Sequence, residues 1–315
     1  RLAQLIVKHN AIVCLEDLNF GFKRGRFKVE KQVYQKFEKA LIDKLNYLVF
    51  KNRNGGAPGG YRNAYQFTAP FESFQKLGKQ SGILFYVVAA YTSKIDPVTG
   101  YIDFLHPRYE SVEKSQVYFE AMESIRFNPE KDYFEFEFDY KKFPVRQNLS
   151  GYQTCWTVCT HGELRYHNRR DNTGVWHSDP VNVTARLKEL FERSGIEFSQ
   201  GQELKQAIVG ISEKSFFSTL LWLLKLTMSL RHSVTGTDED FILSPVADAQ
   251  GNFFDSRKAS EQQPNDADAN GAYHIALKGL WNLQQIKGWD GEGRLNLAMK
   301  NEEWFRFASE KPFRK

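Results

Sequence analysis

Carboxylates at two distant points of the chain have the residue types and positions of metal ligands. Glu16 ends an apolar run from Ile12 that has the length of a buried strand. Asp266 and Asp268 stand just before a helical pattern that begins at Ala269. Divalent ions held by such carboxylates can clamp the attacking and leaving oxygens of a phosphodiester, and Mg²⁺ prefers oxygen ligands. These residues therefore indicate metal-dependent hydrolysis of phosphodiesters.

Each carboxylate also has a simpler interpretation. A glutamate at the end of a strand is often only solvated, and an aspartate just before a helix often caps it or interacts with the helix dipole. Capping explains one of Asp266 and Asp268 well. If folding brings Asp266 and Asp268 near Glu16, which is distant in the sequence, a pair of metal ions explains them better. The sequence leaves both interpretations open.

A basic loop follows Glu16 and suits a polyanionic partner. Residues 1–53 contain 12 Lys and Arg against 5 Asp and Glu, a local charge of 12 − 5 = +7, whereas the whole chain carries +5. Cations interleaved with aromatic rings can hold single-stranded nucleic acid by charge pairing and base stacking. The alternative is a solvated loop whose aromatic rings fold back into the core. The candidate binding residues are Phe22, Lys23, Arg24, Arg26 and Lys28.

Arg231 is a candidate phosphate-binding residue. It stands at the end of an apolar stretch, residues 215–231, that predicts a buried helix, and an acidic run that includes Asp240 follows it. A cation at the C-terminus of a helix is favoured by the dipole, which is the simpler interpretation. An arginine beside carboxylates can also bind and orient a phosphate group. The spacing does not decide between the two.

The cysteines and histidines between 155 and 167 do not predict a zinc site. Residues 154–160 have the pattern of a strand, in which Cys155 and Cys159 would lie roughly 13 Å apart. That is too far for both to bind one zinc ion. We therefore expect core cysteines and no zinc. Three cysteines in total cannot form a disulfide framework, which favours a reducing compartment.

The apolar patterns predict an α/β fold interrupted by an α+β unit. Residues 11–15 and 83–88 read as buried strands, joined through a helix at 29–50, and residues 71–77 suggest a short helix. Residues 133–140 alternate apolar and acidic, as in an antiparallel strand with one wet face. A helix at 184–194, capped by Thr184, follows. From Ala269 a helical stripe returns to the first domain, with apolar residues at Tyr273, Ile275, Leu277, Leu280, Leu283 and Ile286.

The start of the chain indicates a piece of a larger protein. At 315 residues it is long enough for about two domains. No signal peptide and no uninterrupted 18-residue apolar run occurs, so we expect no membrane association. The chain begins at Arg1 in what looks like the middle of an amphipathic helix. We therefore expect the C-terminal part of a longer chain.

Five stretches resemble one family, the type V-A CRISPR RNA-guided DNA endonucleases (the Cas twelve-a effectors, once called Cpf). They span nearly the whole chain and are long enough to be highly specific. By resemblance, residues 1–89 are the second segment of a RuvC nuclease domain, 90–260 a Nuc domain, and 261–315 the third RuvC segment. The matching stretches are residues 15–23, 37–46, 91–97, 240–245 and 268–279.

The resemblance assigns roles to individual residues. The second catalytic acid of the family falls on Glu16 and the third on Asp268, both as metal ligands, which leaves Asp266 as a flanking residue. The Nuc-domain arginine implicated in cutting the target strand falls on Arg231, with Asp240 nearby as support. The implied fold is a partial RNase H-like (RuvC) sheet with helices, interrupted by the Nuc insertion.

The implied activity is Mg²⁺-dependent cleavage of DNA unwound by a guide RNA, with two metal ions in the complete site. The implied partners are the guide RNA, the target DNA with its displaced strand, and the N-terminal remainder of the same protein. The expected setting is the prokaryotic cytoplasm, in antiviral defence. Specificity would come from guide pairing. One departure concerns Val88, where the family has proline.

The first RuvC segment, with its catalytic aspartate, and the guide-binding parts are absent from this chain. We therefore expect the chain by itself to be inactive on DNA and poorly stable. Two other functions remain open. One is a nucleic-acid-binding fragment without catalysis. The other is a transposon-encoded relative with the same nuclease core, although the paired CxxC motifs of those relatives are absent.

Overall fold

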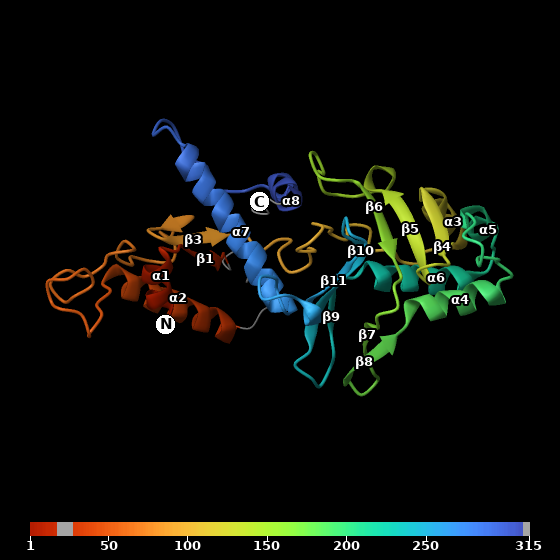
Figure 1. Ribbon diagram of the computed structural model, residues 1–315, viewed down its shortest axis with the longest axis horizontal. Coiled ribbons are helices and arrows are strands. Elements are labelled where there is room, and N and C mark those ends of the chain that lie inside the picture. Colours follow the sequence, from red (N-terminus) through yellow and green to blue (C-terminus); the bar gives the residue numbers. More distant parts are fainter. Residues whose placement is uncertain (18–27, 311–315) are drawn as a thin grey trace. The chain divides into compact units, whose positions relative to one another are not determined.

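The computed structural model describes residues 1–17 and 28–310. By the contacts between its residues the chain divides into two compact units, and each is described by itself (Figure 1). The division into three named segments that the resemblance implies stays a prediction. The first unit is Arg1–Ala90 with Ile275–Lys300, and the second is Tyr91–His274 with Asn301–Lys315.

The first unit is built on two parallel strands. Strand β1 (Val13–Glu16) pairs with β3 (Leu84–Val87) so that Glu16 lies opposite Val87 at the carboxyl end of both. The long helix α2 (Lys28–Asn46) comes between them in the chain, as the sequence predicts. The short strand β2 (Gln80–Ser81) pairs antiparallel with the other edge of β3.

Helices cover both faces of this small sheet. Val13 and Leu15 pack on a core formed with α1 (Leu2–His9) and α2, whereas Cys14, pointing the other way, lies against Gly279 of α7 (Ala267–Gly288). All four residues of β3 are buried. The buried members of the α1–α2 core are Ile6, Leu41, Ile42, Leu45, Leu84 and Tyr86.

Two expectations about the first unit were wrong. Strand β1 is only partly buried and its last residue, Glu16, is exposed, because β1 is an edge strand of the described sheet. Residues 71–77 form turns and bends, not a helix. Their aromatic rings pack locally instead, with Phe71 against Phe74 at a centroid distance of 4.9 Å.

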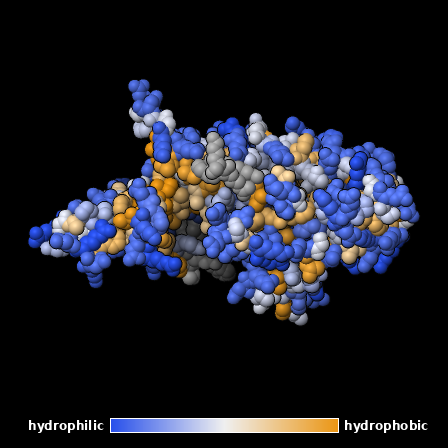
Figure 2. Space-filling model, in the orientation of Figure 1, coloured by the Kyte–Doolittle hydropathy of each residue, from blue (hydrophilic) through white to orange (hydrophobic). Residues whose placement is uncertain are grey.

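The second unit has an antiparallel sheet backed by helices. The alternation at 133–140 works as predicted, because Phe134, Phe136 and Phe138 of the central strand are fully buried. Phe134 meets Phe191 on the covering helix at 5.1 Å between ring centroids. Hydrophilic residues dominate the right-hand end of this unit in Figure 2. The elements are α3 (Val112–Glu120), β4 (Ser124–Asn128), β5 (Tyr133–Asp139), β6 (Cys155–Cys159), α4 (Val183–Arg193), α5 (Lys205–Val209) and α6 (Lys214–Met228).

A hairpin and a second three-stranded sheet complete this unit, and they carry the residues of most interest. The sheet order is β11–β10–β9, with antiparallel pairing throughout. Helix α7 begins after this sheet, and α8 follows it. The elements are β7 (Arg165–Arg170), β8 (Trp176–Val181), β9 (Arg231–Ser233), β10 (Asp240–Ala247), β11 (Phe253–Asp255) and α8 (Asn301–Ser309), with single 3₁₀ turns at Tyr140–Lys142 and Ser256–Lys258.

Two helix ends differ from the sequence-based expectation. Helix α4 is capped by Asn182, whose side chain accepts from the Ala185 amide, whereas Thr184 is buried and bonds to Thr160. Helix α6 ends at Met228, so Arg231 does not close it. Arg231 is instead the first residue of β9. Its side chain therefore does not interact with a helix dipole, and the strand determines the direction in which it points.

Candidate functional site

The two aspartates at the start of α7 have different environments. Asp266 caps the helix, because its Oδ1 accepts from the Ala269 amide at 2.6 Å. Asp268 lies in the first turn and its side chain is 88% exposed. An exposed carboxylate in the first turn is favoured by the dipole and stays open to a ligand. The structure thus leaves Asp268 available and gives Asp266 a structural role.

Arg231 joins Asp240 and Asp268 into one cluster within the second unit. Its Nε donates to Asp240 Oδ1 at 2.9 Å, and its Nη2 donates to Asp240 Oδ2 and, at 3.1 Å, to Asp268 Oδ1. The antiparallel pairing of β9 with β10 brings the first two side chains together. Hydrogen bonds to Asp240 raise the pKa of Arg231, and the charge of Asp268 adds to this. Arg231 and Asp240, on neighbouring strands, therefore meet a third residue from the start of α7.

The chemistry of this cluster follows from its charge and exposure. Two carboxylates against one guanidinium leave a net charge of −1, with only oxygen atoms as metal-ligating donors. The fork of Arg231 is fixed by its two bonds to Asp240, and about a third of its side chain is exposed. A guanidinium held this way can donate its remaining N–H groups to a phosphate oxygen while its bonds to Asp240 stay in place. The cluster can hold a cation and a phosphate side by side.

Glu16 belongs to the first unit, where it is exposed at the end of β1. Close to this strand end lies Lys278 of α7, whose Nζ donates to the carbonyls of Val88 and Ala90 at 2.6 and 2.7 Å. Burial lowers the pKa of Lys278 to about 7, and the charge of Glu16 partly offsets this. The carboxyl end of the β1–β3 pair thus combines an exposed carboxylate with a buried amine.

Lys278 was missed by the sequence analysis, although a signal for it exists. It lies in α7 four residues after His274 and four before Asn282, and these three polar side chains are all buried. Polar residues repeated at a spacing of four fall on one helical face. The repeat of polar residues at a spacing of four, in a helix that otherwise has many apolar residues, is the sequence signal that could have identified Lys278.

The predicted catalytic residues lie in separate units. Glu16 is in the first unit, whereas Asp268, Arg231 and Asp240 are in the second. Within residues 1–17 and 28–310 no group of three or more His, Cys, Asp or Glu side chains converges as a ready-formed metal site. The basic-loop candidates Phe22, Lys23, Arg24 and Arg26 fall outside the described residues, and Lys28 is described only as the start of α2.

The cysteines and histidines of β6 and β7 do not form a metal cluster. Cys155 and Cys159 stand at opposite ends of β6, as the strand pattern predicts. Cys159 is buried, and burial raises the pKa of its thiol to about 12. Cys155, however, is exposed, so its assignment to the core was wrong. It is the first residue of its strand, where the sheet face is open to solvent.

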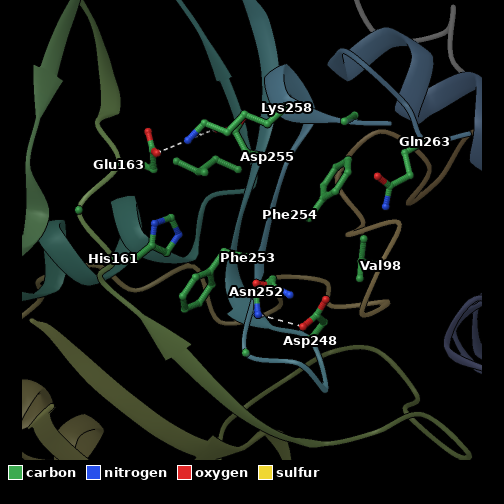
Figure 3. A pocket seen from close by; sticks show the side chains of 14 residues that line it. Val98, His161, Glu163, Asp248, Asn252, Phe253, Phe254, Asp255, Lys258 and Gln263 are labelled. Carbon is green, nitrogen blue, oxygen red and sulfur yellow. Dashed lines mark hydrogen bonds and ion pairs between the residues drawn. The ribbon is translucent and has the colours of Figure 1, made fainter. Parts of the chain in front are cut away.

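A hollow of about 570 Å³ in the second unit is a poorer candidate (Figure 3). Its charged lining groups already have partners, since Glu163 pairs with Lys258, and Asp255 with Arg257 at 2.7 Å. His161 stacks on Phe253 with ring centroids 4.2 Å apart. Because these charged groups and His161 already have partners, the hollow is a weaker candidate for a ligand site than the Arg231 cluster.

The comparison with known protein families gives the general function. A family model described as a RuvC nuclease domain matches residues 1–313. None of the described helices is both long and apolar enough to span a membrane. The predicted fold class is confirmed, since parallel and antiparallel sheets packed with helices suit an RNase H-like nuclease. The chain belongs to the RuvC nuclease domain family, and its general activity is that of a nuclease, a hydrolase of phosphodiester bonds.

Proposed function

We propose that the chain is the C-terminal nuclease portion of a type V-A CRISPR RNA-guided DNA endonuclease. The observation that carries this proposal is the cluster of Arg231 with Asp240 and Asp268. The resemblance assigns these residues to two different domains, yet they share hydrogen bonds in one unit. An arginine beside a metal-binding aspartate can orient a phosphate and stabilise its charge during the hydrolysis of DNA.

Glu16 and Asp268 would hold Mg²⁺, and their chemistry fits this ion. Both are exposed carboxylates, and hard divalent ions prefer such oxygen ligands. RuvC nucleases in general use divalent metals such as Mg²⁺. Bound Mg²⁺ would supply charge stabilisation for the oxygens that attack and leave the phosphorus atom. In this proposal the full two-ion site would also include the aspartate that the resemblance assigns to a first RuvC segment.

Arg231 binds and orients the phosphate of the DNA strand in this proposal. Its two bonds to Asp240 restrict the guanidinium to one plane, which lowers the entropy lost when a phosphate is bound. Asp240 is therefore a supporting residue and does not itself contact DNA. The charge of Arg231 also offsets the repulsion between the phosphate and the nearby carboxylates.

The proposed partners follow from the same resemblance. They are a CRISPR guide RNA, the target DNA with its displaced single strand, and the N-terminal remainder of the protein. The guide would supply sequence specificity by base pairing, so this chain has only to recognise the phosphate backbone. The basic loop at Phe22–Lys28, with a locally positive sequence, is the proposed contact for single-stranded nucleic acid.

The test is Mg²⁺-dependent cleavage of guide-matched DNA by the chain combined with its upstream part and guide RNA. Glu16→Gln, Asp268→Asn and Arg231→Ala should each lower the cleavage rate at least 100-fold, as loss of a group acting on the reacting phosphate does, with DNA binding retained. Asp266→Asn keeps the helix cap and should cleave at the wild-type rate. Glu261→Gln, an exposed carboxylate nearby, is the matched control.

The outcomes separate the competing functions. Full cleavage by the Glu16 or Asp268 variant would remove that residue from the metal site. Tight DNA binding by the wild-type assembly without cleavage would favour the non-catalytic binding fragment. Cleavage of DNA that does not depend on the guide would favour a transposon-type nuclease.

A further inference from the structure

Arg165 is a fully buried arginine without a carboxylate partner among the described residues. It begins β7 and its exposed fraction is 0%. Its Nη1 donates to the backbone carbonyl of Ser229 at 2.9 Å and lies 3.4 Å from that of Leu243, while its Nε has no partner. No acidic side chain in the described part of the chain forms an ion pair with it. A buried cation in this position needs an explanation.

The two neighbouring histidines do not neutralise this charge. The Nδ1 atom of His232 accepts from the Tyr166 amide at 3.4 Å, so its Nε2 carries hydrogen and donates to the Ser229 carbonyl at 2.9 Å. His161 Nε2 likewise lies 2.8 Å from the Ser244 carbonyl, to which it donates. Both rings therefore donate N–H groups to backbone carbonyls. The hydrogen bonds that Arg165 donates are accepted by backbone oxygens.

Stability alone does not account for such an arginine. Burial lowers the pKa of Arg165 to about 9, which still leaves it charged at neutral pH. Replacing a buried charge by an apolar side chain of similar volume is often neutral or stabilising. What Arg165 does provide is hydrogen bonds to the backbone carbonyls of two different segments, at Ser229 and Leu243.

The contacts of Arg165 lie on both sides of Arg231. Ser229 ends helix α6 as its cap residue, and His232 is the second residue of β9. Arg165 bonds the first and contacts the ring of the second at 3.2 Å. Because successive strand residues face opposite ways, the side chain of Arg231 points away from Arg165 when His232 points toward it.

We propose that Arg165 is a positioning residue for Arg231. By donating to the Ser229 carbonyl and packing against the ring of His232, the residues on either side of Arg231 in the chain, it fixes the backbone from which the Arg231 guanidinium reaches Asp240 and Asp268. The inference rests on the proposed role of Arg231 in binding phosphate. The contacts of Arg165 with Ser229 and His232 do not depend on that role. The positioning of Arg231 and its binding of phosphate can therefore be tested separately.

The first test is Arg165→Met, measured in three ways. The melting temperature should stay the same or rise, because an unpaired buried charge is removed. The side-chain Nε–H resonance of Arg231, assigned with Arg231→Lys in the ¹⁵N-arginine-labelled chain, should shift or broaden. The cleavage rate of the assembly should fall roughly 10- to 100-fold, as expected for misplacement by about 1 Å. Arg169→Met, an exposed arginine of the same strand, is the control.

A second variant approaches the same contacts from the other side. His232→Phe keeps an aromatic ring but removes both hydrogen bonds of the imidazole, and it should change the Arg231 resonance in the same way. An unchanged resonance in either folded variant would overturn the proposal, as would failure of both variants to fold. A changed resonance with a wild-type assembly that never cleaves would refute the nuclease proposal but keep the positioning role.

Discussion

At the scale of single residues, Asp266 and Asp268 differ in what holds them. Asp266 is bound to the backbone of its own helix, whereas Asp268 is exposed and touches Arg231. The sequence predicts two carboxylates at this helix start and that one of them caps it. It does not say that Arg231 bonds to the other. That contact depends on the packing of β9 and β10, which helical pattern and capping rules do not describe.

The buried histidines predict acid sensitivity of the second unit. Burial, with a smaller contribution from the charge of Arg165, lowers the pKa of His232 to about 3 and that of His161 to about 4. In the unfolded chain both titrate near 6.5. Below that pH the unfolded state takes up protons that the folded state excludes. Their contribution to stability is therefore complete above about pH 6.5 and is lost as the pH falls to about 4 for His161 and to about 3 for His232.

The expected slope is about 1.4 kcal/mol per pH unit for each histidine in the window between the folded and unfolded values. Urea unfolding at pH 7.5 and pH 5 measures it. His232→Gln should reduce the difference in the free energy of unfolding between these pH values, whereas His9→Gln, at the exposed end of α1, should not. Equal pH dependence in the His232 variant and the wild type would show that this histidine is not held neutral.

At the scale of elements, α7 is the helix whose packing departs most from its sequence pattern. Its predicted apolar stripe includes Ile275, Leu277 and Leu280, all of which are only partly buried. The buried face carries polar residues instead, among them Lys278 and Asn282. The hydrophobic pattern therefore identifies the helix correctly but not which face is buried. Lys278 is buried because it donates to a backbone carbonyl just after β3, and this partner is far away in the sequence.

Gly279 determines how closely α7 approaches β1. A Cβ atom at this position would overlap Cys14 Sγ and lie 3.2 Å from Cys14 Cβ. Gly279→Ala should therefore lower the free energy of unfolding by about 1–3 kcal/mol, as overpacking does, despite the better helix propensity of alanine. Chemical denaturation measures this change.

Two variants serve as controls for this contact. Gly288→Ala, at the last residue of the same helix, meets nothing within 4 Å and should be neutral or slightly stabilising. Cys14→Ala combined with Gly279→Ala should recover part of the loss, because the sulfur atom is then absent. A Gly279 variant as stable as wild type would mean that the helix can move away from β1 without cost.

At the scale of the whole molecule, the α/β class and most strands could be predicted from the sequence. Buried strands such as β3 and alternating strands such as β5 each have a local sequence pattern, and the burial of their residues in the structure agrees with it. The candidate site could be predicted only as separate residues. Glu16 and Asp268 follow from their positions at a strand end and a helix start, and Arg231 follows from the family resemblance. The bonds of Arg231 and its support by Arg165 arise from tertiary packing.

The uneven environments of the three cysteines have a practical consequence. Burial raises the pKa of Cys14 to about 11 and that of Cys159 to about 12, so neither forms thiolate near neutral pH, whereas Cys155 is exposed. A maleimide dye at pH 7 should therefore modify one site, and Cys155→Ser should abolish labelling, as mass spectrometry of peptides would show. Modification of Cys14 at a similar rate would contradict this. The wild-type chain thus comes with its own attachment point for a fluorophore, which permits single-molecule observation without first removing any cysteine.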